Sequence, residues 1–86
     1  RGLVKSATSM SVEIQRRLNE VLARRKHGQK VKVLAHPKIV ERLKNEDRKL
    51  FAAIENDYKA AFSYQPEPAF HIEDFKLQDE LTGQDI

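Results

Sequence analysis

Cysteine is missing from the sequence, and its absence rules out several kinds of site. Without cysteine the chain has no disulfide framework, no thiolate zinc site and no thiol nucleophile. This composition fits a reducing cytosol, so we expect a cytoplasmic protein. Long apolar runs are missing as well, since no stretch approaches the ~20 residues that cross a bilayer and the N-terminus lacks the apolar core of a signal peptide. We therefore expect a soluble chain without a membrane segment.

Motifs of enzyme chemistry are also absent. The sequence has no glycine-rich phosphate loop, no HExxH zinc motif and no nucleophile elbow. Its three histidines, His27, His36 and His71, are scattered along the chain. Glu73 and Asp74 follow His71, but this loose set is a poor metal-ligand motif. Because acid-base catalysis needs a base that a partner orients in a cleft, we expect this chain alone to have no enzyme activity, no cofactor and no metal site.

The length and the charge of the chain suit one small domain. We expect a single domain over residues 1–86 and, because the chain begins with Arg1 rather than Met, a piece of a longer protein. The net charge of +3 hides a gradient: residues 1–30 carry eight Lys and Arg against two Glu, and residues 61–86 carry one Lys against six acids. Such asymmetry permits RNA contact through the first helix, head-to-tail docking between copies, or simply two solvated faces.

The stretch KVKVLAHPKIVERLKNE, over residues 30–46, organises the fold. Its first half alternates between apolar and polar residues and then runs on apolar, which predicts a central strand over 30–36. We expect Val33 and Leu34 to be buried at the heart of the fold, because an unbroken apolar strand end needs cover on both faces.

A helix follows this strand directly. Pro37 cannot donate to the strand ladder but suits the first turn of a helix, and we expect His36 to cap that helix. Apolar residues recur at helical spacing over 37–57. Asn45 and the acids after it favour a break, so this stretch forms either one helix or two.

An amphipathic helix is predicted before the central strand, over 9–27 and after a loop over 1–8. We expect Ser9 to cap it and Gly28 to end it in a left-handed conformation. One face of this helix is apolar, and carries Met10, Ile14, Leu18, Val21 and Leu22.

A second strand is predicted over 60–65, where two prolines end it. A strand, a helical crossover and a second strand usually make a right-handed parallel pair. Residues 75–77 are predicted to form a short third strand antiparallel to the second, and residues 78–86 a frayed tail. The predicted class is therefore α/β, with a sheet of two to three strands, a parallel β-α-β unit and a preceding amphipathic helix.

Two segments, VKVLAHPKIVERLKNE and the later FSYQPEPAFHIEDFKL, resemble the C-terminal small domain of the ribonuclease E/G family of bacterial endoribonucleases. The family pattern is a V-x-V-x-A-x-P entry closed by Asn-Glu, then a strand ending in Asp-Pro and a His-x-Glu-x-aromatic run. It is matched here by Val31, Val33, Ala35, Pro37, Asn45, Glu46, Phe62, Pro68, His71, Glu73 and Phe75. Glu67 replaces the usual Asp, and Phe75 a common Tyr. The opening RGLVKSATSMSVEIQRRL resembles the segment after the family's zinc-binding cysteines.

This resemblance implies a thioredoxin-like fold without redox cysteines. It also implies a parent enzyme that cuts single-stranded RNA with magnesium, in ribosomal RNA maturation or messenger decay. The family's RNA-binding module, catalytic aspartates and zinc cysteines all lie upstream of the matched segment, so single-stranded RNA would be bound mainly there. For this chain, the resemblance implies a non-catalytic domain that supports homo-oligomeric assembly of the parent.

Three functional hypotheses remain. The first is the assembly domain, where three apolar residues either cover the domain's own sheet edge or meet a neighbouring subunit: Phe70, Ile72 and Phe75. The second is a weak, sequence-independent RNA-binding module whose candidate phosphate contacts are Arg16, Arg17, Arg24, Arg25, Lys26, Lys30 and Lys32. This basic region has no aromatic residue for base stacking. The third and weakest is a small metal-dependent hydrolase that uses the His71 region.

Overall fold

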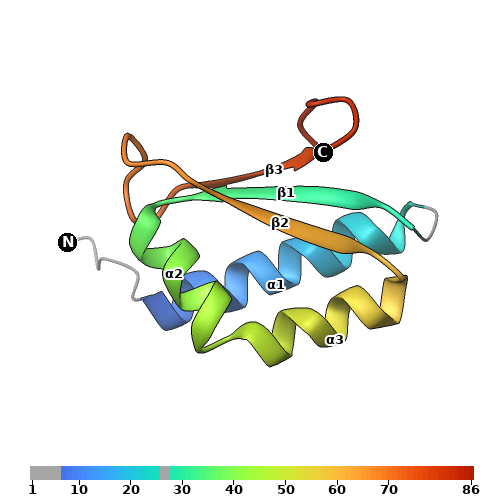
Figure 1. Ribbon diagram of the computed structural model, residues 1–86, viewed down its shortest axis with the longest axis horizontal. Helices are drawn as coiled ribbons and strands as arrows, with labels where there is room; N and C mark the ends of the chain where they lie inside the picture. Colours follow the sequence, from blue (N-terminus) through green and yellow to red (C-terminus); the bar gives the residue numbers. More distant parts are fainter. Residues whose placement is uncertain (1–6, 26–27) are drawn as a thin grey trace.

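A three-stranded mixed sheet with three helices forms the fold (Figure 1). The computed structural model describes residues 7–25 and 28–86. In chain order the elements are α1 (Ala7–Ala23), β1 (Lys30–Ala35), α2 (Pro37–Asn45), α3 (Arg48–Tyr58), β2 (Ala61–Pro66) and β3 (Phe75–Asp79). The predicted α/β class is confirmed, and so is the parallel β-α-β unit, because β1 and β2 pair in parallel.

The central strand is β1, as predicted, and the sheet order is β2-β1-β3. The prediction that the third strand pairs with the second is wrong, because β3 is antiparallel to β1 and lies at the opposite edge. The connection after β2 explains this placement. The Glu67 backbone N–H donates a hydrogen bond of 2.8 Å to the Ala35 carbonyl, so the chain crosses over the end of β1 before β3 begins.

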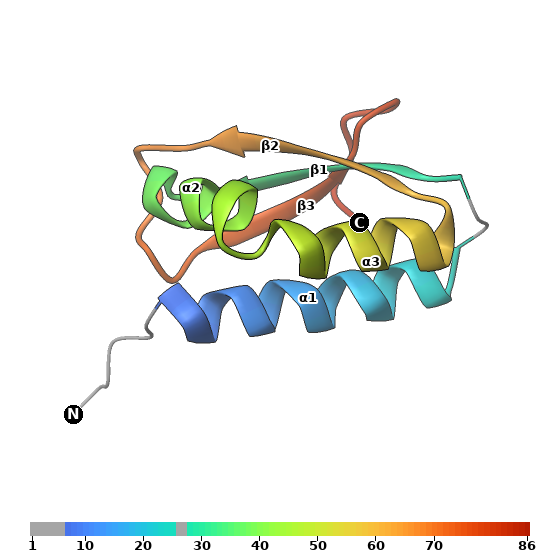
Figure 2. The ribbon, with the colours of Figure 1, turned by 60° about the horizontal axis from the view of Figure 1, so that its bottom comes forward.

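All three helices lie on the same face of the sheet (Figures 1 and 2). Side chains alternate across a strand, so Val31, Val33 and Ala35 point to the helices and are fully buried. Leu34 and Lys32 point to the other face, which no described element covers, and both are only partly buried. The predicted burial is therefore confirmed for Val33 and wrong for Leu34.

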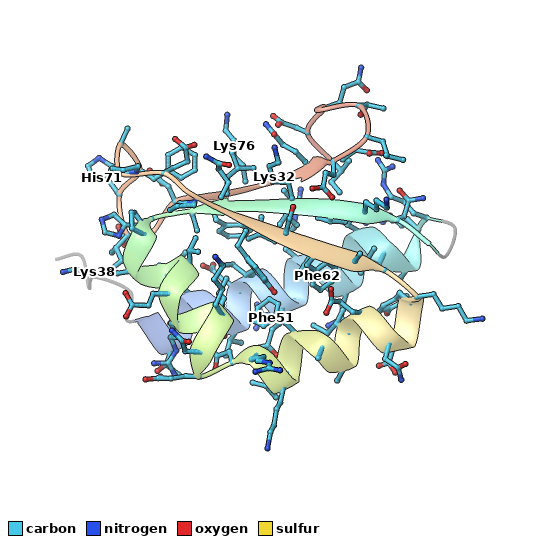
Figure 3. The ribbon with its side chains drawn as sticks, viewed as in Figure 1. Lys32, Lys38, Phe51, Phe62, His71 and Lys76 are labelled. Carbon is cyan, nitrogen blue, oxygen red and sulfur yellow. The ribbon has the colours of Figure 1, made fainter. Side chains whose placement is uncertain are left out.

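The core fills the space between the sheet and the helices. Phe51 of α3 is buried there, and its ring meets Phe62 and Tyr64 of β2 edge to face at centroid distances of 6.4 and 6.3 Å (Figure 3). This geometry suits the ring quadrupoles and adds roughly 0.5–1.5 kcal/mol per pair beyond burial. The helices contribute most of the remaining core, namely Met10, Ile14, Leu18, Leu22, Ile39, Val40, Leu43 and Ile54.

The first helix differs from its predicted bounds. It includes Ala7, a strong helix former, so Ser9 lies inside the first turn rather than at the cap. The helix ends at Ala23, earlier than the predicted end at residue 27. Residues 26–27 of the predicted helix and residues 1–6 of the predicted loop lie outside the described residues. Gly28 has the expected positive φ, 89°, and its N–H donates to the Tyr58 carbonyl at 3.3 Å.

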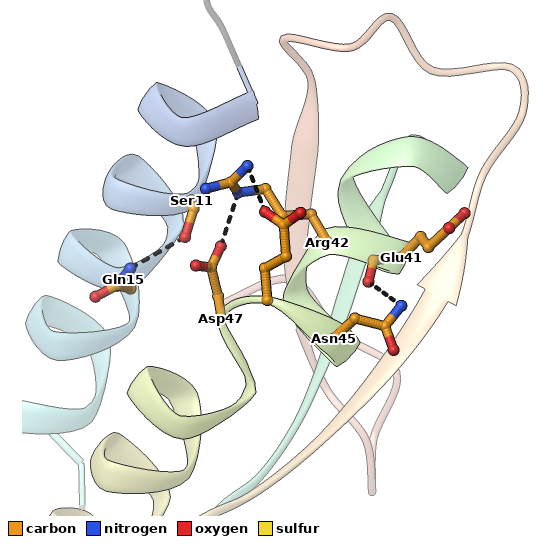
Figure 4. Close-up of polar contacts among 7 residues, drawn as sticks. Ser11, Gln15, Glu41, Arg42, Asn45 and Asp47 are labelled. Carbon is orange, nitrogen blue, oxygen red and sulfur yellow. Dashed lines mark hydrogen bonds and ion pairs between the residues drawn. The ribbon is translucent and has the colours of Figure 1, made fainter.

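Two helices occupy the stretch after Pro37, and Arg42 holds the break between them (Figure 4). The Arg42 side chain donates to the buried carboxylate of Asp47 at 3.1 Å and pairs with Glu46 at 2.8 Å. At the start of α2, Nδ1 of His36 accepts a hydrogen bond from the Lys38 N–H at 3.1 Å, which is the cap the sequence predicted.

The C-terminal segment is not a frayed tail. The chain turns at Gly83, whose φ of 77° favours glycine, and returns along β3. The Asp79 N–H donates to the Gln84 carbonyl at 2.8 Å, and the Ile86 N–H donates to the Leu77 carbonyl at 3.0 Å. Ile86 packs against the core, so apolar burial and two backbone hydrogen bonds hold this segment in place.

Leucine truncation on opposite faces of the sheet tests the one-sided core. Leu77 of β3 is buried on the helix side, so Leu77→Ala should lower the free energy of unfolding by about 2–5 kcal/mol. Leu34→Ala, on the uncovered face, should cost about 1 kcal/mol or less, because less apolar area leaves water when Leu34 folds. Urea unfolding of both variants measures the difference. Equal losses would show that something covers the second face.

Alkaline pH tests the packing of Tyr64. Burial, and secondly the negative charge of Glu55, raises the pKa of Tyr64 from 10.0 to about 12. The folded-state pKa lies above the unfolded one, so the contribution to stability is complete below pH 10 and disappears as the pH rises towards 12. Urea unfolding across this range should show a fall in stability that Tyr64→Phe removes. A phenolate that titrates in the folded protein at the ordinary pKa of Tyr would contradict this account.

Candidate interaction surfaces

Three of the predicted RNA-binding cations lie together on α1 and the turn that follows it. Arg17, Arg24 and Arg25 are exposed and line a groove of about 320 Å³. Positions 17 and 24 are seven residues apart, which places them on the same side of a helix. The C-terminal residue Ile86 forms part of the same groove.

A second groove, of about 390 Å³, adjoins the first and shares Arg17 and Ile86 with it. It runs between α1 and β3. We call the two together the α1–β3 groove, and its lining residues are Arg17, Glu20, Val21, Arg24, Arg25, Phe75, Lys76, Leu77, Asp85 and Ile86. Four of these are cations and two are acids, so the groove is basic with an apolar floor. Sequence reasoning missed Lys76, because it is the lone cation of an acidic third of the chain.

The remaining predicted cations lie elsewhere. Arg16 is on another side of α1, where it lines a hollow with Val12 and Glu13. Lys30 and Lys32 are on β1, and Lys32 projects from the uncovered face of the sheet, away from the helices (Figure 3). Lys26 lies outside the described residues. The structure therefore divides the six described cations of the predicted set among separate surfaces.

The uncovered sheet face is polar around Leu34. Lys32 and Lys76 are diagonal neighbours on it, since Lys32 pairs with Gln78 and Leu34 with Lys76. The acids on this side are engaged by neutral partners: Glu80 accepts a hydrogen bond from the Ser63 hydroxyl at 3.0 Å, and Asp85 accepts one from the Gln78 amide at 3.1 Å. This face lacks the aromatic side chains of a base-stacking platform among its strand residues.

The three predicted interface residues divide into two groups. Ile72 and Phe75 are half-buried and pack against the domain's own core. Phe70 is half-buried but is not part of that core cluster. It lies in the connection between β2 and β3, where its N–H donates to the Glu67 carbonyl at 3.0 Å. Of the three, Phe70 is thus the residue that is not part of the core cluster.

The residues that matched the family pattern lie at the ends of helices and in the connections between elements. Pro37 is the first residue of α2. Asn45 ends α2 and donates to the Glu41 carbonyl at 2.9 Å, next to the Arg42–Glu46 ion pair (Figure 4).

Pro68 and His71 belong to the connection between β2 and β3, and His71 is exposed. The His71 backbone N–H donates to the Asp74 carboxylate at 3.4 Å, so this acid serves a turn. Within residues 7–25 and 28–86, no three His, Asp or Glu side chains gather in a way that would hold a metal ion. None of the helices in those ranges has the length and apolar character that crossing a bilayer requires.

A carboxylate caps a backbone N–H at the outer edge of β2, and no sequence pattern predicted this contact. Glu55, on α3, accepts a hydrogen bond of 2.7 Å from the Phe62 backbone N–H. Because Phe62 is in the strand and Glu55 is in the helix before it, this contact also fixes α3 against the sheet edge.

Comparison with known proteins places the chain in a family. A search of curated proteins finds no match to it. A family model, described as the RNase E/G thioredoxin-like domain, matches residues 1–80. The match covers almost all of the chain and agrees with the small α/β fold that carries no cysteine. By that match, the chain belongs to the RNase E/G thioredoxin-like domain family.

Proposed function

We propose that this chain is a non-catalytic assembly domain of a bacterial, cytoplasmic endoribonuclease that processes RNA. Membership of the RNase E/G family supports the link to a ribonuclease. The parent enzyme would act on single-stranded RNA through residues outside this chain, and the thioredoxin-like domain would help to join its subunits.

The observation that carries this proposal is the position of Phe70. An aromatic side chain that is partly exposed, outside the core cluster and on a connection between strands suits an anchor at a protein interface. Ile72 and Phe75 lie in the same part of the chain and hold it against the core. They would thus support the presentation of Phe70 rather than enter the interface themselves.

The cofactors of the parent would be held elsewhere. The implied magnesium and zinc need clustered carboxylates or thiolates. The described residues group no such donors, and the sequence has no cysteine. The described residues therefore do not fit either ion, and catalytic roles would fall to other parts of the parent.

The alternative function is weak RNA binding that ignores sequence. The three arginines of the α1–β3 groove favour it, because clustered cations attract phosphates. The division of the remaining cations among separate surfaces weighs against it. Such binding would be sensitive to salt and would depend on Arg17 and Arg24 rather than on Lys32.

Serine substitution at Phe70 tests the assembly role. In the full-length parent, Phe70→Ser should shift the oligomer to a smaller species in analytical ultracentrifugation, because an interface loses its buried anchor. The same change should leave the 86-residue chain folded. Phe75→Ser is the matched control, since Phe75 packs on the core and its loss should unfold the chain instead.

Two results would contradict the assembly role. One is an unchanged oligomer with Phe70→Ser, while charge reversal at Arg17 and Arg24 abolishes salt-dependent RNA binding. That outcome would favour the RNA-binding function. The other is unfolding of the 86-residue chain by Phe70→Ser, which would make Phe70 an ordinary core residue.

Hydrolysis assays test the absence of catalysis. The purified chain should leave single-stranded RNA intact with or without magnesium, because its described carboxylates do not group around a metal position. Gel electrophoresis of end-labelled RNA measures this. Magnesium-dependent cleavage that His71→Ala removes would show the metal-dependent hydrolase to be correct after all.

A further inference from the structure

The two edges of the sheet are covered in different ways. Along β3, the returning segment pairs with the strand through its backbone, from the Asp79 N–H to the Gln84 carbonyl and from the Ile86 N–H to the Leu77 carbonyl. Along β2, the other outer strand (Figure 1), no segment runs in the part of the chain that the structure describes. Because an uncovered strand edge is a template for pairing with another chain, the protection of the β2 edge has to come from side chains.

Every second residue of β2 turns its backbone groups away from β1. The Ala61 N–H donates to the Gln29 carbonyl at 2.9 Å, just before β1, so the odd-numbered residues of β2 face that strand. Phe62, Tyr64 and Pro66 therefore face outward. Proline has no N–H, which leaves the N–H groups of Phe62 and Tyr64 as the donors that this edge could offer to another strand.

Glu55 occupies the first of these donors. Its carboxylate accepts the Phe62 N–H at 2.7 Å, the short distance of a charge-assisted hydrogen bond. The end of α3 fixes this contact: Lys59 is left-handed, with a φ of 52°, and the Ala60 N–H donates to the Glu55 carbonyl at 2.8 Å. The chain thus turns back at Lys59 and carries β2 past the last turn of α3, where the Glu55 side chain reaches the strand.

Two copies of this edge are complementary to each other once Glu55 is set aside. In an antiparallel pair with a twofold axis at Tyr64, the N–H and carbonyl of Tyr64 in each copy would bond to those of the other. Phe62 would then lie opposite Pro66 of the second copy, and its N–H would donate to the Pro66 carbonyl. Glu55 removes the Phe62 bonds from this ladder, so the pair keeps only the bonds of Tyr64.

We propose that Glu55 prevents two copies of this chain from joining their sheets through β2. Its carboxylate holds the Phe62 N–H, and a second strand could pair there only by displacing the carboxylate and burying its charge, which is costly. The surface that Glu55 protects is therefore a latent self-pairing interface. The proposal goes beyond the assembly role of Phe70 and does not depend on it.

Removal of the carboxylate tests this role in the 86-residue chain. Glu55→Ala should strengthen self-association about tenfold or more in analytical ultracentrifugation, because each freed Phe62 N–H adds a hydrogen bond across the pair. Hydrogen exchange, measured by NMR, should show the Tyr64 amide becoming protected as the concentration of the variant rises. In the unsubstituted chain the Tyr64 amide should exchange rapidly at every concentration.

A second variant and a matched control separate the edge from the stability of the helix. Glu55→Met keeps an unbranched side chain and a strong helix former but no carboxylate, so it should associate as Glu55→Ala does even if the alanine variant folds poorly. Asp57→Ala removes an exposed acid of the same helix, about 200° around its axis from Glu55, and should leave self-association unchanged.

Three results would overturn the proposal. A folded Glu55→Met chain that associates no more strongly than the unsubstituted chain, with rapid exchange at Tyr64, would show that Glu55 only anchors α3. Association with new protection in β3 instead of β2 would place the contact at another edge. Association of the Glu55 variants that Phe70→Ser abolishes would assign it to the assembly contact, whereas association that survives Phe70→Ser supports pairing through β2 whether or not the assembly role is correct.

Discussion

Burial on one side of the sheet is the constraint on which the other features of this domain depend. Three helices share one face, so each strand must send its large apolar side chains to that face alone. In β1 this requirement places Val31, Val33 and Ala35 inward. In β2 it directs Phe62 and Tyr64 onto Phe51, and in β3 it buries Leu77. The opposite face is left to lysine, serine and glutamine, with Leu34 among them.

The break between α2 and α3 lets two helices cover one short strand pair. A continuous helix over residues 37–58 would extend about 33 Å at 1.5 Å per residue, much longer than a six-residue strand. The turn at Asp47 redirects α3 so that Phe51 and Ile54 reach the core. Arg42 compensates the buried carboxylate at this turn, and removal of such a partner usually costs more than the intact pair contributes.

The sequence was sufficient for the parts of the fold that local chemistry decides. Alternation marked β1, and Pro37 with His36 marked the start of α2. The sequence did not predict the features that depend on contacts between segments far apart in the chain. Nothing near residues 75–79 says which edge of β1 they join, and a strand of continuous apolar residues looks the same whether one face is covered or two. The groove was out of reach for the same reason, because Arg17 and Lys76 are brought together by a pairing that neither segment encodes alone.

The charge gradient of the sequence also changes meaning once the chain is folded. Read along the chain, a basic N-terminal third and an acidic C-terminal third suggest two separate poles. In the fold, the last residues return along β3, and Asp85 enters the groove that Arg17 lines. Glu20 lies among the other arginines. The electrostatic potential that a ligand meets is the sum of the contributions of these positive and negative charges, which partly cancel. It extends about 10 Å from the surface at moderate salt. Cations counted from the sequence therefore overstate the attraction for RNA, because Glu20 and Asp85 offset part of the positive charge where Arg17 lies.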